Sequence, residues 1–163
     1  METQELKFAS KRENIHILEH FVNFIFTELN IDADYYSIVF TALNEAVLNA
    51  IVHGNKENPE KFVNIIMQLK PEGMSFLVKD EGKGFHFDNI PDPTEIDENN
   101  SFSEMKGIYL IKKLADRVVF SDNGSTIETI FNIERMQHKI SIERKRILEQ
   151  FLRNKYSKEL KLN

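Results

Sequence analysis

The chain has 163 residues, of which 41% are hydrophobic and 29% are charged, and its formal net charge at pH 7 is −5. This composition is typical of one globular domain with a substantial core, and it excludes a mainly disordered, collagen-like or repeat protein. The absence of cysteine excludes disulfide scaffolds, thiolate metal sites and cysteine nucleophiles, and it favours a cytoplasmic location.

Neither a membrane nor a nucleic acid is an expected partner. The N-terminus lacks the apolar stretch of a signal peptide, and we expect no segment to approach the roughly 20 apolar residues of a membrane helix. Up to Ile133 the chain carries 12 basic and 22 acidic residues, whereas the rest carries 9 basic and 4 acidic ones. Because nucleic acids bind surfaces rich in lysine and arginine, the acidic body argues against direct contact with them.

The chain opens with signals for a strand and a helix. Apolar and polar residues alternate from Glu5 to Ala9, which predicts a β-strand. Ser10 and Glu13 have the spacing of a capping box, so we predict that a helix begins there and ends near Leu29.

The next elements are a second helix and a hairpin. From about Asp34 apolar residues keep the helical period up to Gly54, a residue suited to the left-handed conformation that ends many helices. Residues 61–70 and 74–80 are short β-prone runs joined by a Pro-Glu-Gly turn, which predicts an antiparallel hairpin. Residues 82–106 are polar and contain two prolines, a pattern typical of a lid or binding loop.

The last elements of the domain are a helix and a second hairpin. We predict a helix over residues 107–116 and strands over residues 117–121 and 126–133, joined by an Asp-Asn-Gly-Ser turn. The order of all these elements predicts an α+β fold, a two-layer sandwich with helices on one face of a mostly antiparallel mixed sheet.

The segment after this domain is basic. Apolar residues recur near helical spacing between its lysines and arginines, so we predict that residues 134–163 form an amphipathic helical extension of a domain formed by residues 1–133. Two interpretations are open: a helix docked on the domain with its charges in solvent, or a helix that binds a partner or a second copy.

Polar residues in the second helix suggest chemistry. Glu45 and Asn49 are four residues apart, so their side chains project from the same face of the helix. Taken alone, they are compatible with two ordinary solvent-facing positions. They lie, however, within the run NEAVLNAIVHGN, which is followed by the strand end Asp80-Glu81-Gly82-Lys83-Gly84-Phe85 and, after the long loop, by Lys106-Gly107.

This order of segments resembles the GHKL nucleotide-binding (Bergerat) fold of gyrases, histidine kinases and mismatch-repair ATPases, with its N box, Asp-x-Gly-x-Gly box, lid and second glycine box. Within that superfamily the amino-acid sequence of the first two boxes, together with the compact length, most resembles the anti-sigma-factor serine kinases of bacterial partner-switching systems. The resemblance covers residues 6–133. It implies an ATP-dependent protein serine kinase that phosphorylates a small anti-sigma-factor antagonist and sequesters a sigma factor, and it implies a homodimer.

The resemblance also implies roles for residues in the first two boxes. Glu45 matches the general base that takes a proton from the substrate serine, and Asn49 matches the asparagine that holds Mg²⁺. Asp80 matches the carboxylate that accepts a hydrogen bond from the exocyclic amine of adenine. Gly82 and Gly84 lack a Cβ, so the backbone can approach the base closely.

Three further nucleotide contacts are expected nearer the C-terminus. Gly107 is expected to begin a helix whose free N–H groups hold phosphate, with Lys106 beside it as an added cation. Thr126 follows Gly124 and Ser125, and it is expected to take the place of the family's late Gly-Thr element.

One departure from the family pattern keeps other functions open. The second glycine box reads Met105-Lys106-Gly107 and lacks its first glycine, which favours, as an alternative, a catalytically weak ATP-sensing module that switches partners. A third reading is a histidine-kinase-type catalytic domain acting on a separate phosphoacceptor. Both alternatives retain ATP as the ligand.

Overall fold

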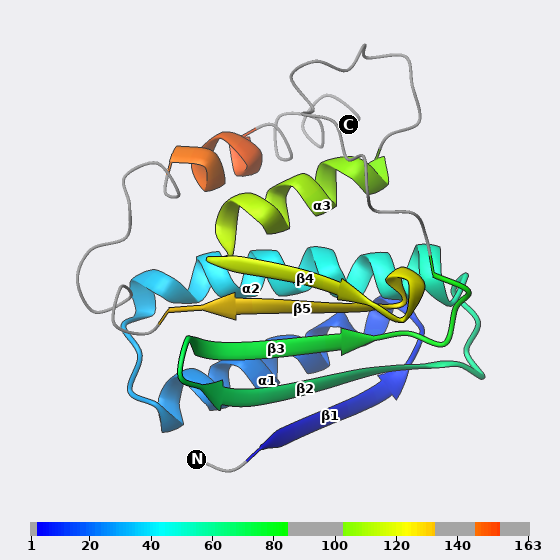
Figure 1. Ribbon diagram of the computed structural model, residues 1–163, viewed down its shortest axis with the longest axis horizontal. Helices are drawn as coiled ribbons and strands as arrows, with labels where there is room; N and C mark the ends of the chain where they lie inside the picture. Colours follow the sequence, from blue (N-terminus) through cyan, green and yellow to red (C-terminus); the bar gives the residue numbers. More distant parts are fainter. Residues whose placement is uncertain (1–2, 85–102, 133–145, 154–163) are drawn as a thin grey trace.

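The computed structural model describes residues 3–84, 103–132 and 146–153 (Figure 1). Its elements in chain order are β1 (Gln4–Ala9), the 3₁₀ turn η1 (Arg12–Asn14), α1 (Ile15–Glu28), α2 (Ala33–Asn49), the π-helical turn η2 (Ala50–Gly54), β2 (Phe62–Lys70), β3 (Gly73–Lys79), α3 (Ser103–Leu114), β4 (Arg117–Ser121), the 3₁₀ turn η4 (Asp122–Gly124) and β5 (Thr126–Phe131). A further helical turn occupies residues 146–153.

The five described strands form one sheet in the order β1-β2-β3-β5-β4, and every pairing between them is antiparallel. Both predicted hairpins are confirmed. Figure 1 shows α1 and α2 side by side behind the sheet, with α3 beyond the β4 edge. The predicted α+β class, with helices layered on one face of the sheet, is therefore confirmed.

The core lies between this sheet and the two long helices. Successive side chains of a strand point to opposite faces, so alternate residues of β2 and β3 meet the helices. The inward residues of these strands are almost fully buried, as are the facing residues of α1 and α2: Val63, Ile65, Met67, Met74, Phe76, Val78, Leu18, Val22, Ile25, Ile38, Val39 and Leu43.

The predicted capping box is wrong. Ser10 is completely buried, and its hydroxyl accepts a hydrogen bond of 2.6 Å from Nδ2 of Asn55 instead of capping a helix. The helix α1 begins only at Ile15, after the 3₁₀ turn, and no side chain caps its first turn. The hydroxyl of Ser10 is therefore engaged by Asn55, 45 positions along the chain, and is not used as the helix cap that local spacing predicted.

The role predicted for Gly54 is also wrong. The second helix begins after Asp32, whose carboxylate accepts a hydrogen bond of 2.9 Å from the backbone N–H of Asp34. It continues through α2 into η2, and Gly54 has no positive φ. This glycine serves a close approach to another segment rather than a left-handed stop.

Among the described residues, the continuous helix Ala33–Gly54 is long and apolar enough to cross a membrane by length and composition alone. The expectation that no segment approaches this length was wrong. Half of the segment is buried inside the fold, and the core helix of a globular protein satisfies the same criterion.

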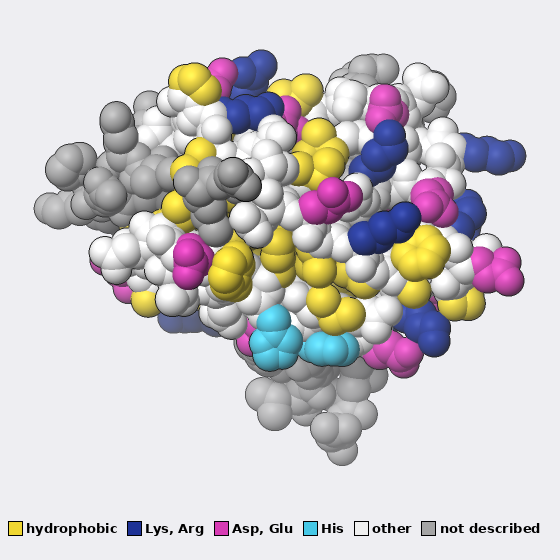
Figure 2. Space-filling model, turned by 90° about the horizontal axis from the view of Figure 1, so that it is seen from below, with side chains coloured by type: hydrophobic (Ala, Val, Ile, Leu, Met, Phe, Trp, Pro, Cys, Tyr) yellow, Lys and Arg dark blue, Asp and Glu magenta, His cyan; other side chains and the backbone are white. Residues whose placement is uncertain are grey.

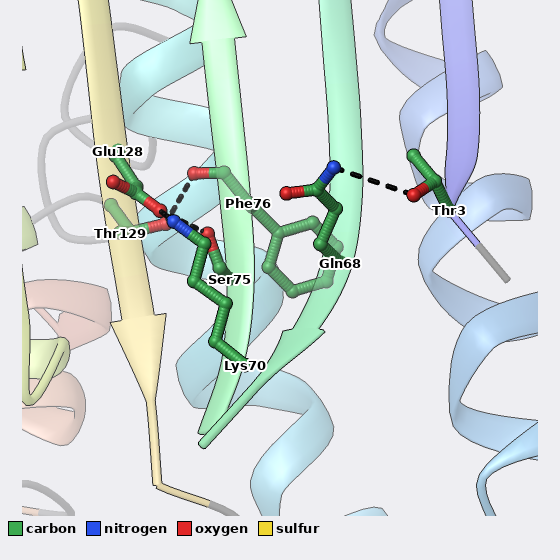
Figure 3. A network of polar contacts seen from close by, with 7 residues as sticks. All are labelled: Thr3, Gln68, Lys70, Ser75, Phe76, Glu128 and Thr129. Carbon is green, nitrogen blue, oxygen red and sulfur yellow. Dashed lines mark hydrogen bonds and ion pairs between the residues drawn. The ribbon is translucent and has the colours of Figure 1, made fainter. Parts of the chain in front are cut away.

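A polar cluster ties β2, β3 and β5 together on the sheet face away from the helices (Figure 3). The carboxylate of Glu128 accepts hydrogen bonds from Nζ of Lys70, at 2.5 Å, and from the hydroxyl of Ser75. Burial acts to raise the pKa of Glu128, but these two hydrogen bonds and the charges of Lys70 and Arg117 outweigh it and lower the pKa. The cluster therefore places an ionised carboxylate next to the hydroxyl of the buried Ser75.

The helical turn at residues 146–153 docks on the domain (orange in Figure 1). Leu148 is 7% exposed and belongs to the same hydrophobic core as the sheet and helices, and the partly buried Ile147, Phe151 and Leu152 pack against that core. Arg146 and Arg153 are exposed. This arrangement agrees with the docked-helix interpretation of the basic segment.

Leu148→Ala is expected to lower the free energy of unfolding by about 2 to 4 kcal/mol, because it removes buried methyl groups and leaves a cavity. Urea unfolding measures the effect. Gln150→Ala, an exposed position on the same turn, is the matched control and should change stability by no more than about 0.5 kcal/mol. Equal stabilities of the two variants would contradict docking.

Candidate functional site

A pocket opens between α2, η2, the end of β3, α3 and the β4–β5 hairpin. It contains roughly 500 Å³ of empty space, part of it open to solvent. Three predicted residues, Asn49, Asp80 and Gly84, line it. The remaining lining residues are mostly apolar or small: Ala46, Ala50, His53, Gly54, Val78, Ile108, Phe120, Gly124, Ser125 and Ile127.

Asp80 is the one carboxylate among these lining residues, and it is 9% exposed. Burial raises its pKa, against the opposing effects of a backbone hydrogen bond from Gly82 and the positive charge of Lys61. A buried carboxylate in an apolar pocket is suited to accept a hydrogen bond from an N–H group of a planar ligand.

Two glycines enclose this carboxylate. A Cβ on Gly54 would lie 2.5 Å from both carboxylate oxygens of Asp80, and a Cβ on Gly82 would lie 2.7 Å from Oδ1. The N–H of Gly82 donates a hydrogen bond of 2.7 Å to the same oxygen. Only residues without side chains fit here, so the predicted importance of Gly82 has a steric reason and Gly54 joins it.

Gly84 shapes the pocket through its backbone. Its φ of +77° is in the left-handed region, and a Cβ would lie 2.7 Å from the carbonyl carbon of Asn123 in the turn before β5. A side chain is therefore excluded twice, by conformation and by space. The loop after Asp80 and the hairpin turn thus meet at the pocket wall.

Glu45 and Asn49 converge under α3. A Cβ on Gly107 would lie 2.9 Å from Oε2 of Glu45 and 3.5 Å from Nδ2 of Asn49, so both side chains reach the same point of the α3 backbone. Both residues are partly buried, and Asn49 lines the pocket. The two polar residues of the N box are therefore not simple solvent-facing positions.

The helix expected to begin at Gly107 begins earlier. Since α3 spans Ser103–Leu114, Gly107 is its fifth residue, whereas the unpaired N–H groups of a helix belong to its first four. Phosphate contacts from this helix would therefore come from residues before Gly107. Gly107 itself allows close packing on Glu45, while Lys106 is exposed.

The structure does not bring Thr126 to the pocket. Its side chain lies on the sheet face opposite Ile127, and its hydroxyl donates a hydrogen bond of 2.8 Å to Asp122. Ser125 lines the pocket instead, and its carbonyl accepts a hydrogen bond of 3.0 Å from the N–H of Asp80. Ser125 is two residues before Ile127, so the alternation of side chains along the strand puts both on the pocket side once the fold has placed Ile127 there.

Parts of the expected site lie outside the described residues. These are residues 85–102, which make up most of the predicted loop, and the side chain of Met105. Within the described part of the chain, no group of three or more histidine or acidic side chains gathers to bind a metal. His16 and His20 lie exposed on α1, with ring centroids 6.4 Å apart. Figure 2 shows two histidine side chains next to each other on the surface (cyan).

The residues present fit a nucleotide. The apolar walls, the buried carboxylate and the glycine cradle around it suit a purine base with an exocyclic amine. The amide oxygen of Asn49 could be one ligand of Mg²⁺, an ion that keeps several waters and binds phosphate oxygens, so a dense protein ligand set is not required.

Asp80→Asn is expected to raise the free energy of unfolding of the nucleotide-free protein at about pH 7.5. A carboxyl group with a raised pKa binds its proton more tightly in the folded state, so wild-type stability falls as pH rises through that pKa. The gain should be complete above the raised pKa and shrink as the pH falls toward the ordinary value. Urea unfolding at two pH values checks this, and a pH-independent difference would contradict it.

Comparisons with known proteins show one family. A family model described as histidine kinase-like ATPase domain matches residues 8–131. The serine-protein kinase RsbW of Staphylococcus aureus is 26% identical over 147 residues, which cover 86% of this chain and 92% of that protein. The RsbW of Staphylococcus epidermidis is 25% identical over the same length.

A solved structure shares the fold. The crystal structure of the RsbU and RsbW domains of a Mycobacterium tuberculosis protein aligns with a TM-score of 0.57 at 14% identity. The match covers 82% of this chain and 33% of that longer chain. At this identity the similarity concerns the fold alone.

Proposed function

The chain belongs to the histidine kinase-like ATPase domain family, and from this premise we propose that it is a Mg²⁺-dependent, ATP-using protein serine kinase that acts as an anti-sigma factor. In this proposal it phosphorylates a serine of a small anti-sigma-factor antagonist and, in its other state, sequesters a sigma factor. Relatives named serine-protein kinase support this at about a quarter identity. The observation that carries it is the convergence of Glu45 and Asn49 next to the pocket that holds Asp80.

Each of these residues has a separate task. Asp80 accepts a hydrogen bond from the adenine amine and orients the base, and the amide oxygen of Asn49 holds the metal. Mg²⁺, when bound, neutralises charge on the phosphate oxygens. Glu45 takes the proton of the substrate serine while the serine oxygen forms its bond to the terminal phosphorus, and ADP leaves with the electron pair of the broken P–O bond.

A second candidate is an ATP-sensing module with little transfer activity. One observation favours it: α3 lies directly against Glu45, leaving no room for a Cβ on Gly107 without displacing the carboxylate. In both candidates ATP binding changes which partner is bound, and because coupling is reciprocal the favoured partner must tighten ATP.

Further parts of the proposal concern the whole protein. We place it in the cytoplasm as a homodimer, with neither membrane nor nucleic acid as a direct partner, and we divide it into a kinase domain of residues 1–133 and an extension of residues 134–163. The acidic charge of residues 1–133 supports a protein partner rather than a nucleic acid.

Calorimetric titration with ATP and ADP, with and without Mg²⁺, tests the proposal. We expect Mg²⁺ to strengthen ATP binding in the wild type, and Asn49→Ala to lose at least about tenfold of that metal-dependent gain. A second assay measures whether phosphate on a purified antagonist survives acid. Phosphoserine survives, whereas the phosphohistidine expected from a histidine-kinase-type domain does not. Absence of ATP binding in the wild type would refute all three functions.

A further inference from the structure

Asn55 is a buried amide whose hydrogen-bonding groups are all used. It follows η2 and is 1% exposed. Its Nδ2 donates to the hydroxyl of Ser10 at 2.6 Å and to the carbonyl of Phe62 at 2.9 Å, and its Oδ1 accepts from the N–H of Glu81 at 2.8 Å. A buried amide with both donors and its acceptor satisfied is rigidly held, since losing any partner would leave a polar group unpaired.

The third of these hydrogen bonds reaches the loop of the nucleotide pocket. Glu81 comes directly after Asp80, and Asn55 holds its backbone N–H. Lys61 holds the other side of the same residue, because its Nζ donates a hydrogen bond of 3.0 Å to the carbonyl of Glu81. The N–H and the carbonyl of Glu81 are thus both held by side chains from the segment between η2 and β2, namely Asn55 and Lys61.

Asp80 lies between two fixed points of the backbone. On one side its own N–H donates to the carbonyl of Ser125 at 3.0 Å. On the other side Asn55 and Lys61 hold Glu81. The carboxylate is then confined between Gly54 and Gly82, so a shift of Glu81 changes where the carboxylate points.

We propose that Asn55 and Lys61 are positioning residues for Asp80, and that their hold on Glu81 sets the preference of the pocket for a base with an exocyclic amine. This inference rests on the proposed binding of ATP. Asparagine suits the position because it supplies two donors toward Ser10 and Phe62 together with one acceptor toward Glu81.

The preference is measurable by comparing two nucleotides. ATP carries the exocyclic amine that is proposed to donate a hydrogen bond to Asp80, and purine riboside triphosphate lacks this amine but is otherwise identical. We expect the wild type to prefer ATP by at least about tenfold in dissociation constant, as for a hydrogen bond to a charged group. Asn55→Ala should reduce this preference to about threefold or less.

Ser10→Ala is the matched control. It removes one hydrogen-bond partner of the same amide but leaves the bond from Glu81 to Oδ1, so it should lower stability without changing the ATP preference. Equal weakening of both nucleotides in Asn55→Ala, or a preference that stays at the wild-type value, would overturn the inference. A merely structural amide would produce one of those two results.

Lys61→Met provides a second test if Asn55→Ala does not fold. It removes the hydrogen bond to the carbonyl of Glu81, and because Lys61 is partly exposed its replacement should not prevent folding. It should lower the preference at least about twofold, while Lys56→Met, exposed in the same connection, should leave it unchanged. An unchanged preference in Lys61→Met would overturn the inference. Wild-type protein that binds neither nucleotide would instead overturn the proposed function, and this inference with it.

Discussion

Glu45→Gln is expected to slow phosphoryl transfer to the antagonist by at least about a hundredfold, the usual contribution of a general base, while ATP affinity stays within about twofold. The glutamine keeps the size of the side chain and can still contact α3, but it cannot accept the serine proton. Glu45 is not among the pocket-lining residues, whereas Asn49 is. Loss of the Glu45 carboxylate should therefore lower the rate of phosphoryl transfer and leave ATP binding intact.

The measurement is single-turnover transfer of phosphate to a purified antagonist, with ATP affinity determined in parallel by calorimetry. Glu28→Gln, an exposed glutamate on α1, is the matched control and should transfer at the wild-type rate. If Glu45→Gln also transfers at the wild-type rate, the base is another group. If the wild type itself transfers no phosphate while binding ATP, the ATP-sensing module becomes the better function.

Gly54→Ala is expected to weaken ATP binding by roughly a hundredfold, about the value of a charged hydrogen bond together with the desolvation penalty of its carboxylate. The added methyl group would lie 2.5 Å from both oxygens of Asp80. Ser125 and Asn55 hold the backbone on either side of Asp80, and the N–H of Gly82 donates to the carboxylate itself, so the carboxylate cannot move aside without breaking hydrogen bonds. Overpacking should also lower stability by about 1 to 3 kcal/mol.

A double-mutant cycle identifies the target of the methyl group. Asp80→Asn should weaken ATP binding alone, and adding Gly54→Ala to it should cost much less than in the wild-type background, since both changes act on one interaction. Calorimetry with ATP provides all four affinities. Additive losses would show that Gly54→Ala acts elsewhere than on Asp80.

Hydrophobic periodicity predicted most of the fold from local information. The two hairpins, the two long helices and the α+β class were recognisable because the period changes from 3.6 to 2 between helices and strands, and turn residues mark the connections. The positions of Glu45 and Asn49 on one helix face followed from spacing alone. Their association with Asp80 followed from a family pattern rather than from physical chemistry.

Contacts between distant segments decided the rest. Ser10 has the local spacing of a helix cap, but its buried hydroxyl pairs with Asn55, so a tertiary hydrogen bond outweighs the cap. Gly54 and Gly107 look like a helix stop and a helix start, yet each is needed for the close approach of another segment. Thr126 was expected at the pocket because it takes the place of the family's late Gly-Thr element. The pairing of β5 with β3 and β4 sets the register of the strand, and that register turns the Thr126 side chain away from the pocket.

The sequence by itself therefore determined the elements, their order and the residue types available for chemistry, because these depend on neighbours within a turn or a strand. Only the tertiary structure decided which glycines must lack a side chain, which hydroxyl faces the pocket and which buried amide holds the loop of Asp80. Each of those depends on atoms from residues dozens of positions apart, whose approach is set by packing of the sheet against its helices.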